Sequence, residues 1–289
     1  MVNIEFWNVR TVFQSSKAAK GAKEFINYKL DIFGINECSC TGSGKMKLIS
    51  EETVLCSGRE TEHVSGPALQ IGRLAESSLK ERCTVSDRIY TARFNSKLIK
   101  MTVVVCYAPT NTADNDDGKA RFNEKLDAIK GVNRHDVLIV GGNFNAKVGC
   151  DNSGRNRCFG CDNSRRNRCI GKFGLLFSDF CQENGFVIGD TLFQYKPVHR
   201  YKWQFPDGLI HNQIKDMAIN RKLVASLRDV RSKRGADVGS DHVMVVTKLQ
   251  LSLRRQAKTI ETKKYDMRKL KSAQGNQKFI LKVANRFEE

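Results

Sequence analysis

The feature that most restricts the fold is a set of short apolar runs, each ending in a polar residue. The clearest is DVLIV at 136–140, which leads directly into GGNFNAKVG at 141–149. An apolar run this short, bounded by glycines, indicates a buried strand rather than a helix. Asn143 and Asn145 then stand where that strand surfaces at the edge of a sheet. Two amides at such an edge raise the question of whether one of them replaces a carboxylate.

Similar runs alternate with segments of helical periodicity along most of the chain. Apolar residues at helical spacing predict helices in the segments 17–30, 121–132 and 174–185. Gly185 is placed to end the last of them. Two strands are predicted around the PDG turn in 200–220, and further strands within 4–7, 30–37, 88–94, 100–109, 135–146 and 240–253. Because the strands are connected in both hairpin and crossover fashion, the pattern favours an α/β sandwich.

The formal net charge of +18 favours a polyanionic partner, with nucleic acid as the default. The alternative is a charge that only serves solubility or belongs to a basic tail. No apolar run reaches the roughly 20 residues that a bilayer span needs. The start, MVNIEFWNVRT, lacks the basic and apolar regions of a secretory signal. We therefore expect an intracellular protein that does not enter a membrane, and a DNA partner is compatible with the nucleus.

Residues 253–289 differ in character from the rest of the chain. This segment is basic and has few strong apolar positions, which predicts a tail or linker that packs poorly. The remaining residues, 1–252, are enough for one large domain.

The chain contains one internal repeat, because GCDNSGRNRCF at 149–159 recurs as GCDNSRRNRCI at 160–170. Two abutting copies of this length indicate a tandem duplication inside a surface loop rather than a repeat fold. A C-x-x-C step with outer cysteines is a zinc-ligand spacing, here formed by Cys150, Cys158, Cys161 and Cys169. Since the inner pair arises whenever two such copies join, a solvated loop of reduced thiols is the preferred interpretation. The loop's basic residues are candidates for contact with a phosphate backbone: Arg155, Arg157, Arg165, Arg166 and Arg168.

A polar residue follows each of several predicted strands, and side chains at one edge of a sheet can converge although they are distant in sequence. Metal-assisted phosphodiester cleavage needs such a set: oxygen ligands for Mg²⁺, a carboxylate for the attacking water, and a donor for the phosphate. A histidine supplies that donor when a carboxylate holds its tautomer. Each residue taken alone also has a structural explanation, such as a turn cap or a surface charge. The set comprises Asn8, Glu37, Tyr107, Asn143, Asn145, Asp241 and His242.

The order of the motifs WNVRT, GINE, CYAPTN, GNFNAKVG, DMAI and GSDHVMVV resembles the endonuclease/exonuclease/phosphatase superfamily. More closely, the chain resembles the endonuclease region of LINE-type retrotransposons and the derived craniofacial development protein 2-like proteins. The motifs TGSGK, TARFNSK and FSDFCQENGFVIGDTLF support this closer resemblance, which covers roughly residues 4–252. The tail resembles the segment that joins this endonuclease to a reverse transcriptase.

The resemblance implies a four-layer α/β sandwich, in which two packed mixed β-sheets are flanked by helices. It also implies hydrolysis of DNA phosphodiesters with Mg²⁺ or Mn²⁺, held by Asn8, Glu37 and Asp241. A monomer that acts on DNA, without a small-molecule cofactor, is the expected state.

Other positions take their roles from the same resemblance. Tyr107 corresponds to the phosphate-contacting tyrosine, and Asn145 to the residue that orients the nucleophile. Asp241 corresponds to the late acidic residue and His242 to the catalytic histidine. Trp203 corresponds to an aromatic residue in a loop near the substrate.

Three positions depart from the family pattern. Asn143 stands where Gly-Asp-Phe/Leu-Asn has its water-activating aspartate, and an amide cannot take a proton or carry that charge. Lys215 replaces the aspartate that orients the histidine, since the family's NQIDH is NQIKD here. The neighbouring Asp216 is expected on the opposite face, because side chains alternate along a strand. Pro67, where the family has a strand residue, suits only an edge or a bulge.

These departures should matter, because general-base catalysis is typically worth ~10²–10⁴-fold in rate. A lysine in the site should also weaken metal binding. The leading hypothesis is a retrotransposon-derived, endonuclease-like protein with impaired or lost hydrolysis. One alternative is a non-catalytic nucleic-acid-binding protein that uses its basic surface. Another is a still-active phosphodiesterase with rearranged ligands.

Overall fold

The computed structural model describes residues 1–9, 15–38, 43–57, 66–109, 116–129, 135–145, 172–193, 203–204, 211–212, 215–236, 238–240 and 242–251, with Ser272, Gln274 and Gln277. The chain divides into two compact units, Met1–Gln256 and Ala257–Glu289. In the second unit only those last three residues are described, and all three are exposed. The predicted tail-like nature of 253–289 therefore stays a prediction.

The first unit contains a seven-stranded sheet. Its strands are Val2–Asn8 (β1), Ile32–Asn36 (β2), Ser43–Lys47 (β3), Thr53–Ser57 (β4), Ala68–Ile71 (β5), Leu227–Lys233 (β14) and Met244–Leu249 (β15). They are ordered β14-β15-β1-β2-β5-β4-β3. The central pair, β1 and β2, is parallel, and the other neighbouring strands are antiparallel.

A second sheet has six strands. They are Leu79–Ser86 (β6), Ile89–Asn95 (β7), Lys100–Tyr107 (β8), Val137–Asn143 (β9), Phe186–Ile188 (β10) and Lys215–Asn220 (β13). Their order is β10-β13-β9-β8-β7-β6, with β8 parallel to β9. A separate two-stranded sheet pairs Trp203–Gln204 (β11) with His211–Asn212 (β12).

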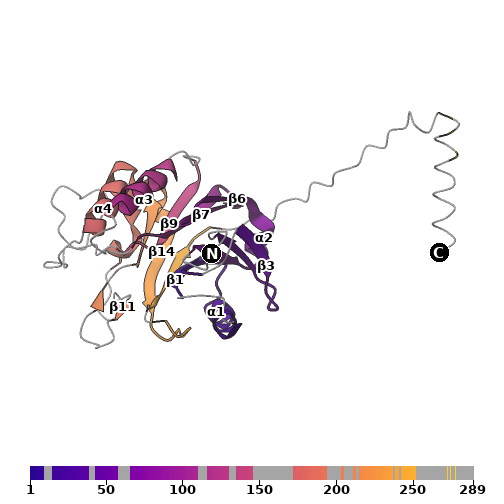
Figure 1. Cartoon of the computed structure of the whole chain (residues 1–289), viewed down its shortest axis with the longest axis horizontal. Coiled ribbons are helices and arrows are strands. Elements are labelled where there is room, and N and C mark those ends of the chain that lie inside the picture. The colour runs from indigo at the N-terminus through magenta and orange to yellow at the C-terminus, as the bar shows by residue number, and fades with distance from the viewer. Residues whose placement is uncertain are drawn as a thin grey trace. The chain divides into compact units, whose positions relative to one another are not determined.

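The α-helices are Ser15–Asn27 (α1), Arg73–Ser78 (α2), Asp116–Ala128 (α3) and Lys172–Glu183 (α4), and two 3₁₀ turns cover Gly189–Thr191 and Arg221–Ser226. Three of the α-helices, α1, α3 and α4, lie on the outer faces of the two large sheets, whereas α2 supplies Ala75 to the cluster between them. Figure 1 shows α3 and α4 together on one side of the molecule and α1 on another. Among the helices that the structure describes, none has the length and apolar character needed to cross a bilayer.

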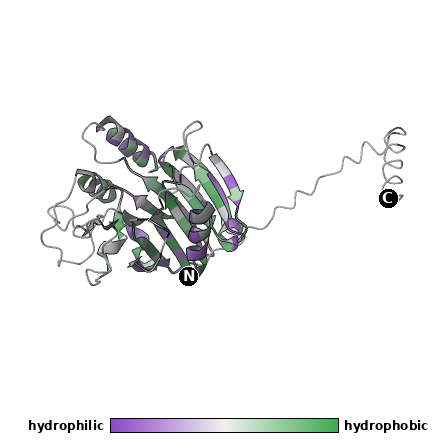
Figure 2. Ribbon diagram, turned by 60° about the horizontal axis from the view of Figure 1, so that its bottom comes forward, coloured by the Kyte–Doolittle hydropathy of each residue, from purple (hydrophilic) through white to green (hydrophobic). Residues whose placement is uncertain are grey.

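Three apolar clusters define the layers. The two sheets meet through residues such as Ile4 and Leu69 of the first sheet and Val103 and Ile139 of the second. On the outer face of the first sheet, Phe25 of α1 packs in a cluster with Phe33, Ile35 and Val246. On the outer face of the second sheet, α3 and α4 supply Phe122, Leu126, Phe177 and Phe180. Figure 2 shows the resulting apolar strands in the middle of the molecule. The predicted four-layer α/β sandwich is confirmed.

Phe6 of β1 lies between the two sheets and explains why glycines face it. A Cβ atom at Gly141 would overlap the Phe6 ring, and one at Gly34 would come within 2.6 Å of its Cδ1 atom. Gly142 has a φ of +141°, and a Cβ atom there would overlap the carbonyl oxygen of Cys106. The double glycine of GGNFN therefore lets β9 approach both β1 and β8, which brings the ends of these strands together.

The segment 200–220 differs from its prediction. The predicted two strands around the PDG sequence are present as the short β11–β12 pair, but the second strand does not continue to Asn220: β13 is a separate third strand that joins the second sheet. The prediction also missed β3, β6, β10 and β14, which are the four outermost strands of the two large sheets. β3, β6 and β14 carry exposed polar residues and lack the apolar runs on which the prediction relied, whereas β10 is buried but only three residues long. The short inner strands β4 and β5 were missed as well.

Pro67 is neither at an edge nor in a bulge, so that expectation was wrong. It directly precedes β5, which lies between β2 and β4. Its carbonyl oxygen accepts a hydrogen bond from the N–H of Ser57 at 3.1 Å. A proline just before a strand removes no donor from the ladder, so the inner strand forms without loss.

A buried ion pair ties β7 to the start of β9. Arg93 donates to both carboxylate oxygens of Asp136, at 2.6 and 3.1 Å, and Thr102 donates to the same group at 3.1 Å. The Asp136 side chain is 3% exposed. Two parallel hydrogen bonds fix the orientation of the two side chains relative to each other. The pair therefore anchors the start of β9, the strand that leads to Asn143.

Candidate active site

The strand directions bring the predicted site residues to one edge of the sandwich. Asn8 ends β1, and because β15 runs antiparallel to β1, His242 just before β15 lies at the same end. In the second sheet, Tyr107 ends β8 directly beside Asn143, which ends β9. β13 begins with Lys215 opposite Asn143. These five residues, which are far apart in the chain, thus reach one region because of sheet topology.

Asn8, Glu37 and His242 form the part of the site on the first sheet. Asn8 is buried, and its Nδ2 atom donates to Glu37 Oε1 at 2.8 Å and lies 3.5 Å from His242 Nε2. Glu37 has a φ of +58°, a conformation that is unfavourable for a residue with a Cβ atom. Such strain persists only where the surrounding contacts enforce it, and it clusters at functional sites. A carboxylate, an amide and an imidazole therefore meet here.

The peptide of His242 is fixed by two further side chains. Ser240 Oγ donates to the Asn8 carbonyl oxygen at 2.7 Å and accepts the His242 N–H at 3.2 Å. Trp7 Nε1 donates to the His242 carbonyl oxygen at 2.7 Å. These bonds hold His242 against the end of β1, and the sequence prediction did not include Ser240.

Asn143 and Asn145 form the part of the site on the second sheet. Asn143 is 2% exposed, and its Oδ1 atom accepts the N–H of Asn145 at 3.1 Å. Asn145 has a φ of +47°, and its Nδ2 atom donates to the carbonyl oxygens of Ala108 at 3.0 Å and Pro109 at 3.2 Å. The side-chain amide of Asn145 therefore links the end of β9 to the residues that follow β8, and the backbone N–H of Asn145 orients the side chain of Asn143.

Tyr107 connects the two parts. Its hydroxyl donates a hydrogen bond to Glu37, across the gap between the sheets. Burial raises the pKa of Tyr107 well above its ordinary value, and the Glu37 charge and that hydrogen bond raise it further. The guanidinium of Arg88 lies 5.1 Å from the centre of the Tyr107 ring and acts in the opposite direction. Tyr107 is therefore a neutral hydrogen-bond donor over the physiological pH range.

Some predicted site residues cannot be placed. Asp241 and the duplicated loop with its arginines and cysteines lie outside the described residues. For Trp203 and Lys215 the strands β11 and β13 fix the backbone position, while their side chains are not described. The strand pairing nevertheless places the backbone of Lys215 opposite Asn143.

A divalent cation fits the described residues only in part. Glu37 offers a carboxylate and Asn8 an amide beside it, which are hard oxygen ligands of the kind that Mg²⁺ prefers. However, no group of three His, Cys, Asp or Glu side chains within the described ranges is arranged to hold a metal ion. With one carboxylate among the described site residues, the charge that retains Mg²⁺ is small, and Asp241 is the remaining candidate.

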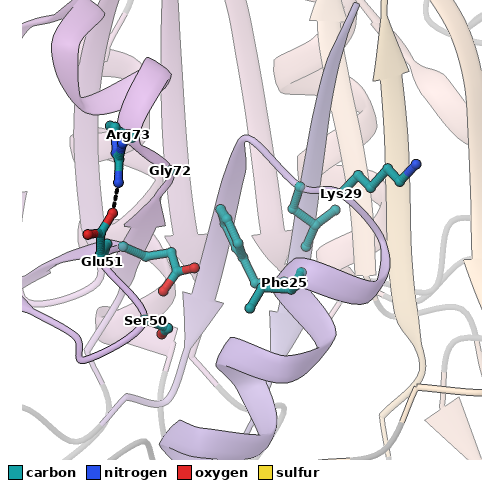
Figure 3. A pocket seen from close by; sticks show the side chains of 9 residues that line it. Phe25, Lys29, Ser50, Glu51, Gly72 and Arg73 are labelled. Atoms are coloured by element: carbon teal, nitrogen blue, oxygen red, sulfur yellow. Dashed lines mark ion pairs between the residues drawn. The ribbon is translucent and has the colours of Figure 1, made fainter.

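A cavity of about 240 Å³ lies elsewhere in the molecule. Figure 3 shows it between the end of α1, the β3–β4 turn and the start of α2, with Phe25 beside it and Glu51 paired with Arg73. Because Lys29 precedes β2 whereas Glu37 follows it, the cavity is at the opposite end of that strand from the site. None of the predicted site residues lines it. The candidate active site is therefore the strand-end cluster, which consists of Asn8, Glu37, Tyr107, Asn143, Asn145 and His242.

Two curated relatives match the chain in sequence. Craniofacial development protein 2 of Tragulus javanicus and that of Bos taurus are each 31% identical to it over 263 residues, or 88% of this chain. The chain spans less than half of their length, 43% and 42% respectively. No protein-family model matches it.

Solved structures share the fold at low sequence identity. The endonuclease domain of TRAS1, a telomere-specific non-LTR retrotransposon, has a TM-score of 0.59 at 15% identity, covering 86% of this chain and 99% of that domain. An AP endonuclease from Archaeoglobus fulgidus has a TM-score of 0.65 at 16% identity, covering 86% and 100%. The 3′ phosphatase NExo from Neisseria, bound to a product DNA hairpin, has a TM-score of 0.63 at 16% identity, covering 86% and 99%. These likenesses establish the endonuclease/exonuclease/phosphatase fold.

Proposed function

Because the chain has the endonuclease/exonuclease/phosphatase fold and is a homologue of craniofacial development protein 2, we propose that it is a retrotransposon-derived, endonuclease-like protein. It binds DNA at the strand-end cluster, and its hydrolysis of phosphodiesters is impaired or lost. The relatives that share the fold include DNA-processing enzymes, which supports DNA as the partner.

The observation that carries this proposal is the environment of Asn143. Its Oδ1 atom already accepts the Asn145 N–H, so the other polar atom of the side chain is the NH₂ group. A carboxylate at this position would keep that hydrogen bond and leave a second oxygen to accept a proton from water. The NH₂ group donates and cannot accept. The buried amide therefore preserves the structure of the strand end but removes the general base.

The other residues retain roles in binding and orientation. When bound, Mg²⁺ or Mn²⁺ would act as a Lewis acid toward the phosphate, held by the oxygens of Glu37 and Asn8. In the DNA complex the single hydroxyl proton of Tyr107 turns from Glu37 to a phosphate oxygen, and His242, held by Ser240 and Trp7, donates to the charge that develops there. Asn145 keeps the end of β9 in position.

Lys215 weakens the metal side of this arrangement. The backbone of Lys215 pairs with that of Asn143, so a positive charge is introduced at a position where the family pattern has the aspartate that orients the histidine, and positive charge near the site disfavours a second cation. Loss of the base and loss of the orienting carboxylate act on one transition state, so their effects combine.

A plasmid-nicking assay tests the proposal. Supercoiled DNA is incubated with the full chain in Mg²⁺, in Mn²⁺ and in chelator, with His242→Ala as the matched control. We expect nicking at least ~10²-fold slower than that of an active relative of the same fold, because the general base is missing. Metal-dependent nicking at the rate of the active relative, abolished by His242→Ala, would contradict the proposal.

A second candidate is a nucleic-acid-binding protein without any hydrolytic activity. The net charge of +18 and the lysine at the start of β13 favour it. Salt-sensitive DNA binding with no nicking above the His242→Ala background supports this candidate, whereas slow nicking that His242→Ala abolishes supports the first.

A further inference from the structure

We propose that Arg88, in the turn between β6 and β7, is a phosphate-binding residue that acts together with Tyr107. This deepens the proposed function, on which it rests, because it names the group that holds DNA at the site. Its chemical target is a single phosphodiester group at the mouth of the strand-end cluster, and the contact does not require a metal ion.

The position of Arg88 follows from the β7–β8 pairing. Ile89 is opposite Cys106, so Arg88 is opposite Tyr107, and the Tyr107 N–H donates to the Arg88 carbonyl oxygen at 2.9 Å. On the other side, the Arg88 N–H donates to Ser86 Oγ at 3.2 Å. The backbone of Arg88 is therefore fixed beside the tyrosine.

The guanidinium of Arg88 is held against the same residue. It lies over the Tyr107 ring at 5.1 Å from the ring centre, and its Nη1 atom donates to the Tyr107 carbonyl oxygen at 3.4 Å. A guanidinium has five N–H donors in a planar fork. The bonds to the Tyr107 carbonyl oxygen and to the Tyr107 side chain use part of these donors, and the rest of the fork can meet a phosphate.

The charge balance at the site also favours an anion. Among the described side chains of the strand-end cluster, Glu37 is the single carboxylate, and Arg88 is only partly buried beside it. With an amide at 143, the negative charge that would compete with a phosphate is reduced. Arginine is suited to this task because it pairs with phosphate oxygens through two parallel hydrogen bonds.

The test is binding of a short fluorescein-labelled DNA duplex to the full chain in chelator, measured by anisotropy at several salt concentrations. The variants are Arg88→Gln, Arg88→Lys and Tyr107→Phe. Arg73→Gln is the matched control, because it removes the same charge from a side chain that is 80% exposed beside the cavity at the opposite end of β2.

We expect Arg88→Gln to weaken binding and to lower the salt slope by about one unit, as loss of one phosphate contact does. Arg88→Lys should keep most of the slope but bind more weakly than the parent, since lysine lacks the fork. Tyr107→Phe should weaken binding without changing the slope, because it removes a neutral donor. Arg73→Gln should change neither quantity by a comparable amount.

A second measurement does not depend on the folding of any variant. Phenylglyoxal modifies accessible arginines, and peptide mass spectrometry reads each site in the unmodified full chain. Bound duplex should protect Arg88 and leave Arg73 as reactive as before.

The outcomes separate this inference from the proposed function. If the parent binds duplex but Arg88→Gln keeps the parental slope and Arg88 is not protected, only the role of Arg88 is wrong. If the parent does not bind duplex at low salt, both the proposed function and the role of Arg88 fail.

Discussion

At the scale of single residues, the site is defined by which atoms can gain or donate a proton. Asn143 keeps the shape of a carboxylate but not its ability to accept a proton, and Tyr107 is held as a neutral donor. Glu37 is kept in a strained conformation by its contacts with Asn8 and Tyr107. The two parts of the site are thus joined by hydrogen bonds although one proton acceptor is missing.

The state of Tyr107 gives a prediction for alkaline pH. Its pKa is raised in the folded protein, so above the ordinary pKa of tyrosine the unfolded chain releases a proton that the folded protein retains. Stability should therefore fall as pH rises beyond about 10. Tyr107→Phe should make this fall less steep, measured by urea unfolding between neutral and alkaline pH. An unchanged slope in that variant would show that Tyr107 titrates normally.

At the scale of elements, the site depends on how closely β9 approaches β1. Gly141 faces the ring of Phe6, and Gly142 adopts a backbone conformation that L-residues rarely take. The strand pairings that follow place Tyr107 beside Asn143 and Asn8 beside Asn36. Packing of one aromatic ring against a glycine therefore determines whether the two strand ends meet.

Gly141→Ala tests this packing. The added methyl group would overlap the Phe6 ring, and overpacking of a core typically costs about 1–3 kcal/mol. Gly21→Ala in α1 is the matched control, because its Cβ atom would lie 3.9 Å from Phe33, at ordinary contact distance. An alanine inside a helix should even stabilise it by up to ~1 kcal/mol. Equal unfolding free energies for the two variants, from urea titration, would contradict the packing argument.

The buried ion pair at the start of β9 gives a second prediction at this scale. Arg93→Ala leaves the Asp136 carboxylate buried without its guanidinium, which should cost on the order of 3 kcal/mol of unfolding free energy. Lys80→Ala, which removes a partner of the solvent-exposed Glu81, should change stability little. The comparison is a pair of chemical-denaturation curves, and a similar loss in both variants would exclude a special role for the buried pair.

The central parallel strands could be predicted from the sequence, whereas the outer strands and the site residues Arg88 and Ser240 could not. Apolar runs such as DVLIV marked β1, β2, β8 and β9, because buried parallel strands are apolar on both faces. The outer strands β3, β6 and β14 gave no such signal, and the apolar run of β10 is only three residues long. Arg88 was missed because its place beside Tyr107 depends on the β7–β8 register, which composition does not reveal. Ser240 was missed because its hydrogen bonds to Asn8 and His242 arise from tertiary structure.

At the scale of the whole molecule, two sheets pack so that strand ends from both converge at one edge. The first unit forms this sandwich. Part of the net charge of +18 belongs to residues outside the described ranges. The duplicated loop at 149–170 and the segment 253–289 contribute to that charge. In the proposed function, the sandwich positions the DNA and the basic charge attracts it over longer distances.

Deletion of residues 160–170 tests the contribution of the duplicated loop. The second copy carries three of the candidate arginines, Arg165, Arg166 and Arg168. Its removal should reduce the salt slope of duplex binding while the thermal unfolding midpoint stays unchanged, because surface loops tolerate changes in length. An unchanged salt slope would place the phosphate contacts elsewhere.

The central claim is that Asn143 and Lys215 silence an otherwise assembled site, and repair of both positions tests it most directly. The variant carries Asn143→Asp, Lys215→Asp and Asp216→His, and its plasmid nicking in Mg²⁺ is compared with the parent, with each partial repair and with the same variant carrying His242→Ala. We predict that partial repairs recover little and that the full repair nicks DNA, because the two lost carboxylates act on one transition state. A full repair that is folded and binds DNA but does not nick it would contradict the account.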